Sequence, residues 1–292
     1  MKPFGAFLMR GRRNAALLAL LFALLPFLNW LSVIIMALVT LRKGAKEGAL
    51  ILLCVLMPAC ILALIARDFA ILYNVLLTAI IVWLLAIVLH KSHDWSVVLL
   101  VGVALGIVGI IAVHSYIDDI NAWWQQRMLA YLQQVSTDMH VNTVQQKQVV
   151  MHLSKIATGI QATLLLAVNL LWLLVARYWQ AILYNPGALR AELHRIRMPR
   201  WASIVLVLLG LAGLLTQFMV IVDLLPIALL AFMLAGLSLV HFIIAARKAH
   251  WLWLLVFYII LVFALPYIGM ALVILALADS LLNLRQRYQA VS

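Results

Sequence analysis

Charged residues are scarce in this chain: they make up 10% of its 292 residues, whereas 67% are apolar. A soluble domain contains about a quarter charged and about half apolar residues. A water-soluble fold of this length would lack the polar surface needed to cover it, so lipid must be the solvent for most of the chain. The composition excludes a soluble globular protein and predicts a polytopic membrane protein.

Acidic residues and cysteines are also few. The chain has 21 lysines and arginines but only 9 aspartates and glutamates, which gives a formal net charge of +12. Basic residues gather in the cytoplasmic loops of membrane proteins, so this excess indicates topology and not nucleic-acid binding. Cys54 and Cys60 lie in one apolar segment. They are about 240° apart around a helix and cannot form a disulfide bond.

Motifs of nucleotide and metal chemistry are missing. The sequence has no GxxxxGK phosphate-binding loop, no HExxH, no GxSxG and no paired CxxC. These motifs would supply phosphate binding, zinc ligands or a nucleophile. We therefore expect no enzymatic activity, no metal site and no cofactor.

Long apolar runs account for most of the chain. A membrane span needs about 20 apolar residues, because the hydrocarbon core is about 30 Å thick. Five segments fit this length, at 69–90, 96–117, 157–176, 202–221 and 224–245, and a sixth, at 48–66, is slightly short and contains Pro58. Two longer runs, 15–41 and 251–284, hold Pro26 and Pro266 near their middle. Proline interrupts helical hydrogen bonding, so each run is either one kinked span or a hairpin of two short helices.

The distribution of basic residues favours hairpins at both ends. With two hairpins, 17 of the 21 basic residues are cytoplasmic, and the four outside are Arg67, Arg127, Lys147 and Lys155. A single span at 15–41 would reduce the split to 13 against 8. The positive-inside rule prefers the larger asymmetry. We predict an all-α transmembrane bundle of about 8–10 membrane helices, with ten apolar helical segments and both termini in the cytoplasm.

This topology divides the chain into five parts. Residues 1–117 and 202–292 hold the N-terminal and C-terminal membrane helices, and 157–176 is a separate span. Residues 118–156 are rich in glutamine and carry apolar residues at helical spacing until Ser136, Thr137 and Asp138 interrupt the pattern. We expect an extracytoplasmic helical hairpin there, whose tryptophans lie at the lipid headgroups.

The fifth part, residues 177–201, is basic and cytoplasmic. Its NPG sequence predicts a turn, because proline ends a helix and glycine permits chain reversal. The helix expected after the turn carries apolar residues on one face and basic residues beside them. It either lies on anionic lipid or docks a cytosolic partner. Its candidate contact residues are Asn185, Pro186, Gly187, Arg190, His194, Arg195 and Arg197.

Polar side chains within the apolar segments are candidates for a solute site, since hydrocarbon penalises them unless they have partners. The candidates are Asn74, His114, Gln161, Asn169, Asp279, Arg42 and Arg285. Asp279 lies inside the last apolar run, and Arg42 and Arg285 are its two candidate partners. Asp223, in contrast, is expected in water at an outer turn. Small residues predict close helix packing at Gly102, Gly106 and Gly109.

Three segments together carry a resemblance to a known family. They are LRKG at 41–44, YNPGALRAELHRIR at 184–197 and ADSLLNLRQR at 278–287. With them the chain resembles the YybS-like family of bacterial inner-membrane proteins. That family is distantly similar to the S components of energy-coupling-factor vitamin transporters and to the rod-shape protein MreD. The resemblance implies an S-component-like fold in a bacterial inner membrane.

The same resemblance bears on partners. In S components, a first helix with AxxxA spacing contacts the energising membrane subunit, and Ala15, Ala19 and Ala23 have this spacing. The chain departs from the pattern because it has more helices than the six of an S component. Two functions remain open. One is a solute-binding or transport subunit that a separate partner energises, and the other is a structural or assembly protein that binds envelope partners.

Overall fold

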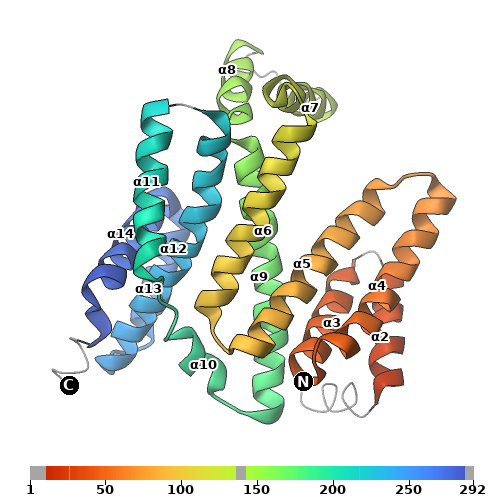
Figure 1. The fold of residues 1–292 in the computed structure, drawn as a ribbon, viewed down its shortest axis with the longest axis horizontal. Coiled ribbons are helices and arrows are strands. Elements are labelled where there is room, and N and C mark those ends of the chain that lie inside the picture. The colour runs from red at the N-terminus through yellow and green to blue at the C-terminus, as the bar shows by residue number, and fades with distance from the viewer. Residues whose placement is uncertain (1–10, 26, 136–142, 217, 287–292) are drawn as a thin grey trace. The chain divides into compact units, whose positions relative to one another are not determined.

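The protein is seen in a computed structural model that describes residues 11–25, 27–135, 143–216 and 218–286. These residues are helical apart from short connections, and they contain no strand, so the all-α prediction is confirmed (Figure 1). Six of the described helices are long and apolar enough to cross a membrane, whereas α11 and α13 are apolar but shorter. The protein is therefore an integral membrane protein. The six long helices are α4 (Ala45–Ala66), α5 (Ala70–Ser92), α6 (Trp95–Tyr116), α9 (Ala157–Tyr184), α12 (Met219–Ala246) and α14 (Leu265–Leu282).

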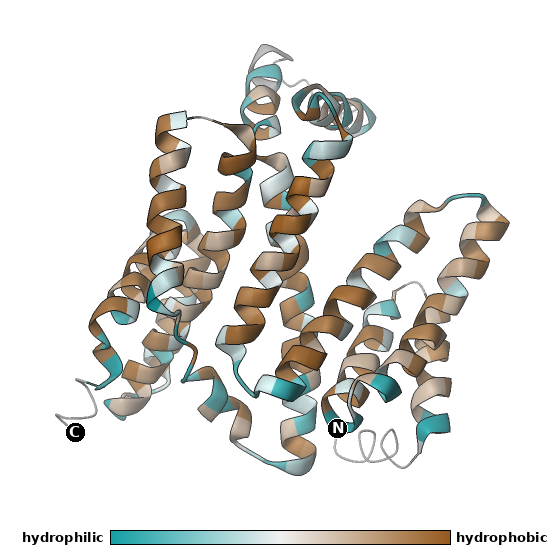
Figure 2. Ribbon diagram, in the orientation of Figure 1, coloured by the Kyte–Doolittle hydropathy of each residue, from teal (hydrophilic) through white to brown (hydrophobic). Residues whose placement is uncertain are grey.

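The chain forms two compact units. Unit 1 comprises residues 1–102 and 167–197, and unit 2 comprises residues 103–166 and 198–292. Helices α6 and α9 each contribute residues to both units. Figure 2 shows hydrophobic residues along the long helices and hydrophilic residues at helix ends and on α7 and α8, as expected for segments bounded by water.

Unit 1 is built around α3 (Asn29–Lys43), which packs against α2 (Arg12–Leu24), α4 and α5. All ten residues from Ser32 to Leu41 are buried, so α3 is covered on every side. A helix that is apolar all round needs this environment. The run at 15–41 is therefore a pair of packed helices, and its second arm is shielded by protein.

Unit 2 is built around α12, which packs against α14, α11 (Arg200–Thr216) and α13 (Leu252–Phe263). Here the run at 251–284 divides at Ala264, and Pro266 lies in the first turn of α14. Proline is tolerated there because an N–H group in the first turn would have no acceptor within the helix, so its absence removes no hydrogen bond. Helices α7 (Ile120–Val135) and α8 (Thr143–Ser154) pack against each other. The predicted break at Ser136, Thr137 and Asp138 lies outside the described residues.

Several helix boundaries differ from those predicted from the sequence, and three of them concern helices that carry candidate functional residues. Helix α9 continues to Tyr184, eight residues beyond the expected end of its span at 176. Helix α12 begins at Met219 instead of 224, which places Asp223 inside the helix. Helix α10 covers only Ala188–Leu193. The last two differences change the assignment of candidate functional residues.

Candidate functional site

A carboxylate–imidazole pair lies inside unit 2, between α12 and α6. His114 Nε2 is 2.7 Å from Asp223 Oδ2, across 109 positions of sequence. The Asp223 side chain is only 2% exposed and that of His114 12%. A carboxylate accepts hydrogen bonds only, so the imidazole donates its Nε2–H to Asp223. The prediction that Asp223 is in contact with water at a turn was wrong.

The other oxygen of Asp223 binds the first turn of α9. The backbone N–H of Gly159 donates to Asp223 Oδ1 at 2.8 Å. The first N–H groups of a helix have no intrahelical acceptor, and a helix N-terminus attracts negative charge. Asp223 therefore caps α9 from another helix. The contact requires glycine, since a Cβ on Gly159 would lie 2.2 Å from the backbone oxygen of Asp223.

Helix α7 reaches the same end of α9. Trp124 Nε1 on α7 donates to Thr158 Oγ1 at 2.9 Å, next to Gly159. Trp124 thus joins α7 to the turn of α9 that Asp223 caps. With neutral His114 the pair carries one negative charge, and with protonated His114 it carries none.

A second buried carboxylate, Asp279, is paired with a permanent cation. Arg285 Nε donates to Asp279 Oδ2 at 2.9 Å, and Arg285 Nη2 donates to Ser238 Oγ at 3.2 Å. The Asp279 side chain is 3% exposed and that of Arg285 11%. Of its two predicted partners, Asp279 binds Arg285. Arg42 instead places its guanidinium 4.2 Å from the centre of the Tyr184 ring. A guanidinium keeps its proton, so the pair in unit 2 has a fixed charge.

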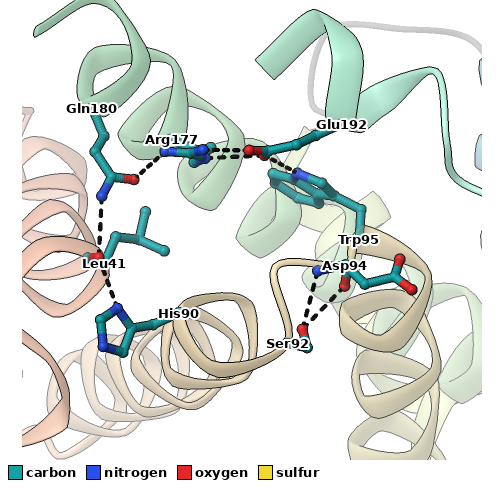
Figure 3. Close-up of polar contacts among 8 residues, drawn as sticks. All are labelled: Leu41, His90, Ser92, Asp94, Trp95, Arg177, Gln180 and Glu192. Carbon is teal, nitrogen blue, oxygen red and sulfur yellow. Dashed lines mark hydrogen bonds and ion pairs between the residues drawn. The ribbon is translucent and has the colours of Figure 1, made fainter. Parts of the chain in front are cut away.

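Unit 1 holds a polar network that joins several helices (Figure 3). The carbonyl of Leu41, in the last turn of α3, accepts hydrogen bonds from Gln180 Nε2 at 3.1 Å and His90 Nδ1 at 2.9 Å. Such terminal carbonyls have no intrahelical donor. Gln180 Oε1 in turn accepts from Arg177 Nη1 at 2.6 Å. Every bond satisfies a backbone or side-chain group, so this network stabilises the unit.

The network also holds α10 in place. Arg177 forms an ion pair with Glu192, and Trp95 Nε1 donates to Glu192 Oε2 at 3.3 Å. Beyond α10, the backbone N–H of Arg197 donates to Ser96 Oγ at 3.1 Å. Arg177, Trp95 and Glu192 were not among the functional residues predicted from the sequence. The sequence does contain one indication of this contact: Glu192 is an acidic residue within a basic segment, which suggests an ion pair.

These contacts correct the predicted basic amphipathic helix. The NPG turn at 185–187 is present, and Gly187 has a φ of +90°, which strongly favours glycine. The following helix ends at Leu193, so His194, Arg195 and Arg197 do not continue the basic face that begins at Arg190. Ile196 is buried. The segment is therefore not one continuous amphipathic helix.

The uncharged polar candidates do not converge on one place. Asn74 is exposed and donates to the Ala70 carbonyl of its own helix at 2.8 Å, and Gln161 is also exposed. Asn169 differs from both. Its residue is 0% exposed, and neither Nδ2 nor Oδ1 has a hydrogen-bond partner among the residues that the structure describes. A buried amide without a partner is rare and points to a missing polar group.

The small-residue candidates have different surroundings. Ala15 and Ala19 on α2 are buried and Ala23 is half-buried, so protein of this chain already covers two of the three. Gly106 lies against Ile227, whose Cδ1 is 1.9 Å from the position of an added Cβ. Gly102 is buried. Gly109 has open space around its Cβ position, so the predicted packing face does not extend to it.

Comparison of the chain with protein-family models, curated protein sequences and solved structures found no match. The assignment of function therefore depends on the residues and contacts of the chain itself.

Proposed function

We propose that the protein is a solute-binding or transport subunit of a bacterial inner membrane, energised by a separate partner. The observation that supports the proposal is the buried amide of Asn169. Asn169 lies about 18 Å along α9 from its first residue, at about 1.5 Å per residue, which is near the middle of a bilayer core about 30 Å thick. A polar group in this position needs a polar partner.

The free energy involved is substantial. A buried amide that forms no hydrogen bond destabilises a protein by about 1–3 kcal/mol, and Asn169 has both a donor and an acceptor without partners among the described residues. A solute with a neutral polar group would satisfy both atoms. Trp172 lies one helical turn further along α9 and stacks on Trp30, with ring centroids 5.3 Å apart. An aromatic pair beside an amide is typical of sites that bind a planar, uncharged solute.

The source of energy is assigned to a partner because the sequence has no phosphate-binding loop. The resemblance to S components supports the same division of labour. The contact with that partner would not use Ala15 and Ala19, since both are buried.

The test is a thermal-shift screen of uncharged planar solutes on the detergent-purified protein. The parent should gain thermal stability with at least one solute, by an amount that rises with solute concentration. Asn169→Leu should remove this gain. Without solute, Asn169→Leu should be more stable than the parent by about 1–3 kcal/mol, because leucine needs no hydrogen bond.

Asn74→Leu is the matched control, because Asn74 is exposed and bonded within its own helix. This variant should keep the response to solute. If Asn169→Leu is less stable than the parent and responds to solute as the parent does, the proposal is wrong. Absence of any solute response, together with stable co-purification of envelope proteins, would favour the assembly function.

The proposed orientation, with α7 and α8 outside, has its own test. After Cys54 and Cys60 are replaced by alanine, a cysteine at Gln133 on α7 should react with an impermeant thiol reagent in intact spheroplasts. A cysteine at Lys248, after α12, should react only after the membrane is opened. The reverse pattern would contradict the proposed orientation.

A further inference from the structure

We propose that His114 and Asp223 form a proton-binding site that locks α6, α9 and α12 together when the proton is bound. The site belongs to unit 2 and shares no residue with the amide of Asn169, so it can succeed or fail independently of the proposed function. Asp223 on α12 links the three helices, since it accepts hydrogen bonds from His114 on α6 and from Gly159 on α9.

The proton has one place to bind. The imidazole Nε2–H already donates to Asp223 Oδ2, so the added proton binds Nδ1 and no other bond forms or breaks. The pair then changes from one negative charge to a neutral imidazolium–carboxylate pair. A net charge is costly in a buried site, and a hydrogen bond between two charged groups is roughly twice as strong as one between neutral groups. Proton binding therefore tightens the link between α6 and α12.

The route for the proton follows from the two exposures. His114 is the more accessible partner, with 12% of its side chain exposed against 2% for Asp223. It lies in the last turn of α6, and the polar residues Asp118 and Asp119 follow the helix. Of the two partners, His114 is therefore the one that a proton from water reaches more readily.

Other titratable groups lie on the helices and connections next to the pair, and two of them contact residues other than His114 and Asp223. Asp119 Oδ1 accepts from the backbone N–H of Ala122 at 2.9 Å, and the Arg127 guanidinium lies 4.1 Å from the centre of the Trp123 ring. In the described part of the chain, none of these groups forms an ion pair with His114 or Asp223. The groups on the adjoining elements are Tyr116, Asp118, Asp119, Arg127, His152 and Lys155.

The pair of Asp279 and Arg285 provides an internal comparison. It is equally buried and lies in the same unit, but its cation cannot lose a proton. A buried carboxylate needs a cation for stability, and arginine would supply one at every pH. Histidine at position 114 supplies one only when a proton is bound, which is the property of a proton-binding site.

The test is hydrogen–deuterium exchange of the first turn of α9 in the full-length protein in nanodiscs, corrected for the intrinsic pH dependence of exchange. When the pH is lowered from about 8 to about 5.5, protection of the amides at 157–161 should rise roughly tenfold. His114→Gln retains an N–H donor for Asp223 but cannot titrate, so its protection should be the same at both pH values.

Two further measurements make the result decisive. Asp279→Asn should keep the tenfold pH dependence, although it lowers stability. Proton uptake by the parent over the same range, measured with an indicator dye, should exceed that of His114→Gln by one proton per chain. If His114→Gln does not fold, Asp223→Asn replaces it and should also show no pH dependence. Equal protection of the parent at both pH values, or a pH dependence that survives in His114→Gln, would overturn the proposal.

Discussion

Replacement of Gly159 by alanine should destabilise the protein, although alanine is the better helix former. An ideal Cβ at this position lies 2.2 Å from the backbone oxygen of Asp223 and 2.8 Å from its Cα. Both are backbone atoms of α12, so no side-chain rotation can relieve the overlap. The start of α9 must move away from α12, and the hydrogen bond from Gly159 N–H to Asp223 Oδ1 then lengthens or breaks.

The magnitude follows from three opposing contributions. Alanine gains about 1 kcal/mol of helix propensity over glycine. Overpacking costs about 1–3 kcal/mol. Loss of a hydrogen bond to a charged carboxylate costs about 1.5–3 kcal/mol. The net expectation for Gly159→Ala is a loss of about 1.5–5 kcal/mol, opposite in sign to the effect of propensity alone.

The assay is thermal unfolding of the purified protein, followed by the fluorescence of its 10 tryptophans. Gly109→Ala is the control, because a Cβ at Gly109 meets no atom within 4 Å. It should unfold at the temperature of the parent or slightly above it. The close approach of α9 and α12 is refuted if Gly159→Ala unfolds no earlier than Gly109→Ala.

Three further predictions concern the remaining contacts. Asp279→Asn should lower the free energy of unfolding by about 3–5 kcal/mol in a denaturant titration, because it leaves the buried Arg285 without its anion; an unchanged midpoint would contradict this. Glu192→Gln should release α10 from Arg177 and speed limited proteolysis at residues 185–199, whereas an unchanged cleavage rate would show that the ion pair contributes nothing. Gly187→Ala should cost about 1 kcal/mol, since the left-handed φ of +90° disfavours a Cβ, and full parental stability would contradict the described turn.

The helices themselves were predictable because their signals are local. A run of about 20 apolar residues specifies a membrane helix without reference to the rest of the chain. The division of the run at 251–284 was also predicted, since Pro266 interrupts helical hydrogen bonding wherever it occurs. The turn at 185–187 was predicted for the same reason, because glycine can adopt the positive φ of Gly187 without any contribution from distant residues.

The environment of each polar residue was not predictable in the same way. Asp223 was expected in water because it lies at the turn between the predicted spans 202–221 and 224–245. It is buried because His114 and Gly159, 109 and 64 positions away, satisfy its two oxygens. The partners of Glu192 were not predictable either, since Arg177 and Trp95 lie 15 and 97 positions away in the chain.

The sequence by itself determined that this protein is a helical membrane protein and where most of its helices lie, because hydrophobic length and proline act within one segment. The tertiary structure alone decided which polar groups are buried together. It paired one buried carboxylate with arginine and the other with histidine, and it left the Asn169 amide without a partner among the described residues. The physical reason is that the free energy of a buried polar group depends on partners brought to it by other helices, and the distance along the chain carries no information about them.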